Sequence, residues 1–220
     1  MKSEGMKSGF RSGLLLTWAL TAGLLACGTD SIVAPPPPPD PGPLPTESLS
    51  FLRQSGTAPA LVTTDTTLVA TKGTKTEVRI RYEPLPGQIE GEEFLELKIE
   101  EASLFRYPPA HPRAGQLFED GDTITIRIRV DPTDLVVTLD PSGIEFDANQ
   151  PAELEIRYGN ADDDYDDDGT PDPPETESQI DLWRQENVGD PWFRIGEIKD
   201  AELDRVRARL TSFSRYALAI

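Results

Sequence analysis

A short acidic segment carries the residues of this chain whose types and spacing could do chemistry. Residues 160–177 hold nine carboxylates and no basic side chain, and within them aspartates alternate over five positions before a glycine and a later glutamate. This order, D-x-D-x-D-G-x5-E, is typical of loops that bind calcium, which prefers six to eight oxygen ligands. The candidate ligands are Asp164, Asp166, Asp168, the backbone carbonyl of Thr170, Asp172 (through a water molecule) and Glu175.

A second interpretation of this segment needs no ion. Pro171, Pro173 and Pro174 restrict the backbone that would wrap the cation, and no amphipathic helix is expected on either side, as an EF-hand would require. A chain rich in aspartate also produces this spacing by chance. The alternative is a solvated insertion between two strands, kept mobile by the repulsion of its own charges. The residues leave both interpretations open, and calcium is the one cofactor they suggest.

The composition of the whole chain excludes several classes of function. Its 220 residues carry 21 basic and 39 acidic side chains, a formal net charge of -18, which excludes non-specific binding to nucleic acid. A single cysteine allows neither an intramolecular disulfide nor a cysteine-based zinc site, and a single histidine leaves little for histidine chemistry. The sequence also has no glycine-rich phosphate loop and no HExxH motif.

The amino terminus predicts export and a lipid anchor. Basic residues precede an apolar stretch, residues 14–26, which is too short to span a bilayer. The stretch ends in Leu24-Leu25-Ala26-Cys27, which resembles the lipobox of bacterial lipoproteins; an ordinary secretory signal is the alternative. The resemblance implies a diacylglyceryl thioether and an acylated amino group on Cys27, and hence firm attachment to a membrane. Because Gly28 follows instead of aspartate, it also implies the outer membrane if the cell is Gram-negative.

A proline-rich segment follows the predicted anchor. Eight of the 21 prolines lie between Pro35 and Pro45, and such a run favours an extended polyproline II spacer at about 3.1 Å per residue. We therefore expect a signal peptide over 1–26, a lipid-anchored linker over 27–49 and one folded domain over 50–220, with the acidic segment as an insertion.

The rest of the chain shows the period of β-strands. Apolar and polar residues alternate over 76–82, 122–130 and 152–158, which indicates strands with one buried and one wet face. Shorter runs at 95–99, 134–139 and 216–220 add further strands, and turn signals such as Pro86-Gly87 separate them. Residues 201–210 fit a helix or a strand, and we expect a strand from 205. The pattern predicts an all-β fold, an antiparallel β-sandwich.

The carboxyl-terminal half resembles a known domain family. The stretches 140–158, 180–198 and 211–220 are similar to the ZU-five domain, named for zonula occludens protein and the uncoordinated-five netrin receptors. The similarity lies in a proline/serine-glycine turn, a strand of the form P-A-x-L-x-I-x-Y, two tryptophans and a closing F-S-x-Y-A strand. The resemblance implies a β-sandwich that mediates protein contacts, usually without enzymatic activity.

Some eukaryotic relatives in that family cleave themselves at a His-Phe-Ser site, where the histidine assists attack by the serine. The matching triplet here is Ser212-Phe213-Ser214, and the one histidine, His111, lies far away in the sequence. A serine hydroxyl without a base is a poor nucleophile, so we predict no self-cleavage. Trp183 and Trp192 could form a carbohydrate platform, but their positions beside apolar strands favour a packing role.

Together these features predict a membrane-anchored cell-envelope lipoprotein that acts as a non-catalytic protein-binding or scaffolding module. Its expected partners are the membrane, through lipid on Cys27, and an envelope or extracellular protein, with no nucleic acid. Calcium is a candidate structural ion. The alternatives are an envelope enzyme, either a carboxylate-based hydrolase or a domain that cleaves at Phe213-Ser214, and a purely structural envelope protein.

Overall fold

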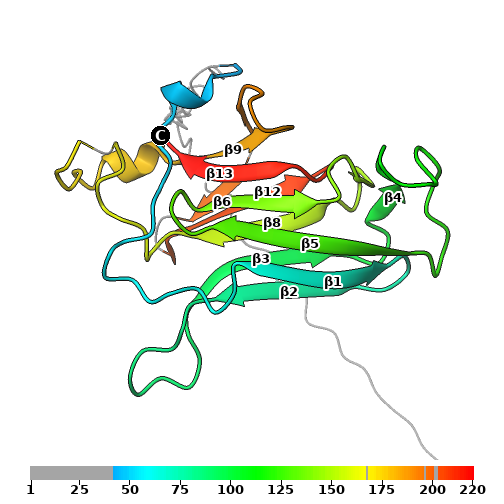
Figure 1. Cartoon of the computed structure of the whole chain (residues 1–220), viewed down its shortest axis with the longest axis horizontal. Coiled ribbons are helices and arrows are strands. Elements are labelled where there is room, and N and C mark those ends of the chain that lie inside the picture. The colour runs from blue at the N-terminus through cyan, green and yellow to red at the C-terminus, as the bar shows by residue number, and fades with distance from the viewer. Residues whose placement is uncertain (1–41, 167, 196, 201–202) are drawn as a thin grey trace, which may run out of the picture. The chain divides into compact units, whose positions relative to one another are not determined.

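The computed structural model describes residues 42–166, 168–195, 197–200 and 203–220. The predicted signal peptide, Cys27 and most of the proline run lie outside these ranges. The described part is an antiparallel β-sandwich, which confirms the predicted fold class (Figure 1). Its two helices are short 3-10 turns, η1 (Thr46–Ser48) and η2 (Thr176–Gln179), and no described helix has the length and apolar character needed to cross a bilayer.

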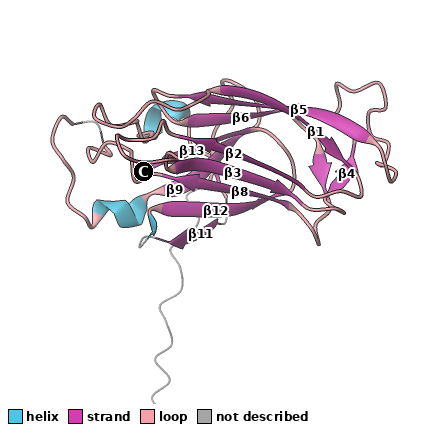
Figure 2. Ribbon diagram, turned by 90° about the horizontal axis from the view of Figure 1, so that it is seen from below, coloured by secondary structure: helices cyan, strands magenta, loops and turns pink. Residues whose placement is uncertain are grey.

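Two large sheets and one strand pair make up the sandwich, and all neighbouring strands are antiparallel. The six-stranded sheet has the order β1 (Asp65–Thr71), β5 (Thr123–Asp131), β6 (Val136–Asp140), β13 (Arg215–Ala219), β9 (Asp181–Gln185), β10 (Phe193–Arg194). The five-stranded sheet has the order β11 (Glu197–Asp200), β12 (Arg205–Leu210), β8 (Ala152–Arg157), β3 (Glu93–Ile99), β2 (Thr76–Arg81). Figure 2 shows β4 (Leu104–Arg106), which pairs with β7 (Glu145–Phe146), at the end of the sandwich away from the carboxyl terminus.

The core is formed by the apolar side chains that alternate with polar ones along the strands. In β5, Ile124, Ile126 and Ile128 are buried while Thr125 and Arg127 are exposed. Burying one face of each sheet against the other removes the apolar side chains from water, and this burial is the main favourable term in folding. The ambiguous segment after residue 204 forms β12, as we predicted. The prediction of core roles for the two tryptophans is also confirmed, since both are at most 4% exposed.

A second, smaller core lies on the outer face of the six-stranded sheet. Leu44 exchanges two backbone hydrogen bonds with Trp192, at 2.8 and 2.7 Å, and the Trp192 indole donates to Thr46 Oγ1 at 3.2 Å. Leu49 is buried beside Trp183 and Trp192. The folded unit therefore includes residues 44–49, which the sequence-based boundary assigned to the linker. Two tryptophans on the outer face of a sheet need an apolar cover, and this segment supplies it.

Candidate functional site

The acidic segment leaves the end of β8 and returns through η2 to β9, at the end of the sandwich away from β4 (Figure 1). Its first residues are tied to the start of the folded unit, because Asp162 N–H donates to the Arg53 carbonyl at 2.8 Å. Tyr165 packs against the main core and holds the middle of the segment on the protein. Both ends and the middle of the segment are thus fixed to the sandwich.

Three of the predicted calcium ligands converge. Asp164, Asp166 and Asp172 each place a carboxylate oxygen within 4.8 Å of the other two. Backbone N–H groups orient these side chains: Asp164 accepts from Gly169 at 2.8 Å, and Asp172 accepts from Tyr165 at 2.7 Å. Removal from water, together with the neighbouring carboxylates, raises the pKa of Asp166. The three groups are hard oxygen donors that suit a divalent cation.

Two other predicted carboxylate ligands, Asp168 and Glu175, do not join this group of three. Asp168 instead caps the turn, accepting from the backbone N–H of Thr170 at 2.9 Å and from its hydroxyl at 2.5 Å. Glu175 is exposed where η2 begins. Gly169 adopts a φ of 90°, the left-handed backbone that its place in the motif predicts. The structure therefore brings together three of the five predicted carboxylate ligands.

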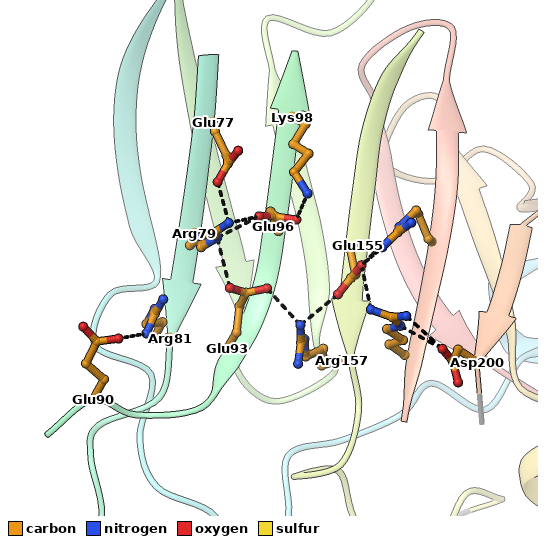
Figure 3. A network of polar contacts seen from close by, with 12 residues as sticks. Glu77, Arg79, Arg81, Glu90, Glu93, Glu96, Lys98, Glu155, Arg157 and Asp200 are labelled. Atoms are coloured by element: carbon orange, nitrogen blue, oxygen red, sulfur yellow. Dashed lines mark hydrogen bonds and ion pairs between the residues drawn. The ribbon is translucent and has the colours of Figure 1, made fainter. Parts of the chain in front are cut away.

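A charged network covers the outer face of the five-stranded sheet (Figure 3). At its centre Glu96 of β3 lies directly opposite Glu155 of β8, and these two side chains are only 6% and 4% exposed. Basic side chains surround both: Arg79 and Lys98 contact Glu96, and Arg157, Arg205 and Arg207 contact Glu155. Two like charges opposite one another repel, so this pair depends on the cations around it.

The buried Glu96 carboxylate is a poor candidate for acid catalysis. Burial alone would raise the pKa of Glu96, but hydrogen bonds from Lys98 and Arg79 outweigh it and hold the pKa below its ordinary value. A carboxylic acid that donates a proton at neutral pH needs a raised pKa. This pair was not predicted from the sequence, because glutamates at outward positions of alternating strands look like residues of a solvated face. The arginines on the neighbouring strands were the sequence feature that could have indicated a buried ion-pair network.

The triplet at residues 212–214 is held by a cation. Arg184 donates to Ser214 Oγ at 2.8 Å and to Ser212 Oγ at 2.6 Å, and Ser214 is 1% exposed. Phe213 is fully buried and packs edge-on against Phe146. A guanidinium cannot take a proton from serine. His111 lies elsewhere, stacked on Tyr107 with ring centroids 4.3 Å apart.

We expect the chain to stay intact at the Phe213-Ser214 bond. Intact mass spectrometry of the purified protein, after prolonged incubation, should show one mass, and Ser214→Ala should behave identically, because the Ser214 hydroxyl accepts from the Arg184 guanidinium, which cannot take its proton. Two fragments that separate between these residues in the wild type, and not in Ser214→Ala, would contradict the prediction.

Comparisons with protein-family models, curated proteins and solved structures give no match for this chain. The resemblances to a lipobox and to the ZU-five domain therefore depend only on the residues that carry them.

Proposed function

We propose that this protein is a lipid-anchored cell-envelope protein whose β-sandwich, of the ZU-five type, is a non-catalytic binding or scaffolding module. The main observation in support is the position of the single cysteine, at the end of an apolar export signal and ahead of a proline-rich segment that leads into a folded sandwich. Two further observations support a non-catalytic role. The buried carboxylates Glu96 and Glu155 are ion-paired, and Ser214 faces Arg184 instead of a base.

The partner in this proposal is another envelope or extracellular protein. Affinity capture from intact envelopes, with the mature chain as bait, tests it directly. The capture should be run in parallel with calcium and with a chelator. The acidic loop lies on the surface, so a partner that contacts it would be captured differently in the two conditions. Recovery of the same protein by two differently tagged baits supports the proposal, and recovery of lipid alone contradicts it.

Replacing Cys27 should release the protein from the membrane. In Cys27→Ala no thioether can form, so we expect the protein to move from the detergent phase to the aqueous phase and to lose incorporation of labelled palmitate. The control is Asp164→Ala, which leaves the lipobox unchanged and should stay membrane-bound. Retention of the Cys27→Ala protein in the membrane fraction would show that the anchor is not on this residue.

We also propose that calcium stabilises the acidic loop. Asp164, Asp166 and Asp172 would supply its carboxylate ligands, with water completing the shell that calcium requires. A cation there would offset the repulsion that contributes to the raised pKa of Asp166. The loop would then be fixed between β8 and β9 as a rigid part of the binding surface.

Calcium should raise the melting temperature of the protein. At a calcium concentration tenfold above the dissociation constant, binding to the folded state alone adds about 1.4 kcal/mol of stability. The difference between calcium and chelator should vanish in Asp164→Ala and persist in Asp120→Ala, a matched change of an exposed aspartate outside the loop. An equal calcium effect in both variants would place the ion elsewhere.

A further inference from the structure

β1 forms an open edge of the six-stranded sheet, next to β5 (Figure 1). It is seven residues long and pairs with β5 on one side, and no strand of the described chain pairs with its other side. An edge strand presents a row of unpaired backbone N–H and C=O groups, to which another strand can add. Proteins protect such edges by making them short, by placing charges on them or by covering them.

The other edge strands of the two large sheets carry this protection. β2 is covered at one end, where Val62 N–H donates to the Arg81 carbonyl at 2.8 Å, and it exposes Glu77 and Arg79. β10 is only two residues long, and β11 has the sequence EIKD, in which three of four residues are charged. β1 is different, because after Asp65 it contains neither a charge nor a proline. The unprotected edge therefore calls for a partner strand.

The register with β5 shows which backbone groups of β1 point outward. In an antiparallel pair, opposite residues alternate between those that exchange hydrogen bonds and those that do not. Just beyond the ends of β1, Val130 N–H donates to the Thr64 carbonyl and Lys72 N–H donates to the Asp122 carbonyl, both at 2.8 Å. The even-numbered residues of this segment therefore bond to β5, and the odd-numbered residues direct their N–H and C=O groups away from the sheet.

Two residues in the middle of β1 keep these outward groups free. At the ends of the row, Asp65 bonds through its N–H and its C=O to Thr63 Oγ1, at 3.2 and 2.8 Å, and the Thr71 carbonyl accepts from the following turn at 3.1 Å. Between them, the N–H and C=O groups of Thr67 and Val69 have no partner among the described residues. Both side chains lie on the exposed face, where Val69 is 59% exposed. The edge thus offers two donors and two acceptors to an added strand.

The β1 strand of a second copy fits these groups. We propose that the protein forms a twofold dimer in which β1 pairs antiparallel with β1 of another copy, about an axis at Leu68. Thr67 of each copy then lies opposite Val69 of the other, and the two pairs exchange four hydrogen bonds. The exposed Val69 side chain gains a neighbour on the same face of the joined sheet. Pairing two edges in this way leaves neither open.

The charges at the ends of β1 favour this arrangement. Asp65 at the start of the strand is ion-paired with Arg127 of β5, so no uncompensated carboxylate lies at the contact. Lys72 follows the end of the strand, and antiparallel pairing sets it toward the Asp65 end of the other copy, whereas parallel pairing would bring two lysines together. Because the strand between these ends is neutral, the contact avoids the repulsion expected between two strongly acidic chains. Symmetry supplies this match without a foreign strand.

Analytical ultracentrifugation of the mature chain over a range of concentrations tests the proposal, with Cys27→Ala in every protein so that lipid does not cause association. The mass should rise to twice that of one chain, and the amides of Thr67 and Val69 should gain protection from hydrogen exchange over the same concentrations. Val69→Lys places a charge on the edge and should raise the dissociation constant of the dimer at least about tenfold. Thr125→Lys, the same change at the exposed residue opposite Val69 on β5, should dimerise as the wild type does.

Melting temperatures of the two lysine variants, measured where both are monomeric, should agree, which separates lost pairing from unfolding. The mass of a single chain at every concentration would overturn the proposal. So would a dimer that Val69→Lys leaves unchanged, or one in which the Thr67 and Val69 amides stay unprotected. Protection of these amides only after addition of an envelope extract would assign the edge to a foreign strand, and self-pairing would be wrong. The dimer depends on neither the lipid anchor, calcium nor the envelope partner, so its outcome is separate from theirs.

Discussion

Replacing Gly91 by alanine should lower the stability of the folded unit by at least about 3 kcal/mol, the upper part of the range for overpacking. An alanine Cβ at this position would lie 1.7 Å from the Tyr82 carbonyl oxygen and 2.6 Å from its carbonyl carbon. Backbone atoms cannot turn aside as a flexible side chain can. The strand pairing must shift instead, and it is held here by a hydrogen bond from Tyr82 N–H to Glu92 O at 2.9 Å.

Thermal unfolding measures this effect, and about 3 kcal/mol corresponds to a fall of roughly 6–12 °C for a chain of this size. The control is Gly56→Ala, since position 56 is exposed and has no atom within 4 Å of an added Cβ. Both glycines have ordinary φ values, so the two variants differ in steric contact and not in backbone strain. Equal melting temperatures for the two variants would contradict the close approach of Gly91 to Tyr82.

Much of the sandwich follows from local pattern. The alternating runs at 76–82, 122–130 and 152–158 became β2, β5 and β8, because a period of two leaves a strand only one face to bury. The alternation did not predict β1. Its sequence DTTLVAT has threonines on both faces of the strand, and Val69 is 59% exposed, so apolar and polar residues do not alternate clearly. The strand is defined instead by its pairing with β5 at the edge of the sheet. Edge strands depend on neighbours that a single sequence does not name.

The candidate sites were less predictable because they depend on distant contacts. Asp164, Asp166 and Asp172 lie close in sequence, and their convergence follows from a local turn around Gly169. The charged network around Glu96 and Glu155 instead combines residues from positions 79 to 207. In sequence Glu96 is only a polar residue of a short alternating run. The cations that surround it come from neighbouring strands, which the alternation does not position.

Replacing Trp192 by alanine should destabilise the attachment of residues 44–51 to the sandwich by about 3–5 kcal/mol, the cost of deleting a fully buried aromatic side chain. Trp192 is 1% exposed and contacts the Phe51 ring at 5.2 Å between centroids. Its indole also donates to Thr46. Because this cluster lies on the outer face of its sheet, apart from the main core, residues 44–51 should detach before the sandwich unfolds.

The location of the loss distinguishes this effect from general unfolding. In hydrogen exchange, amides of residues 44–51 should lose protection in Trp192→Ala while those of β5 keep theirs. The control is Phe193→Ala, a change of the next residue, which is 45% exposed and should alter stability by less than about 0.5 kcal/mol. Uniform loss of protection in both sheets would show instead that the two cores unfold together as one cooperative unit. Loss confined to 44–51 would show that Trp192 sets where the linker ends and the folded domain begins.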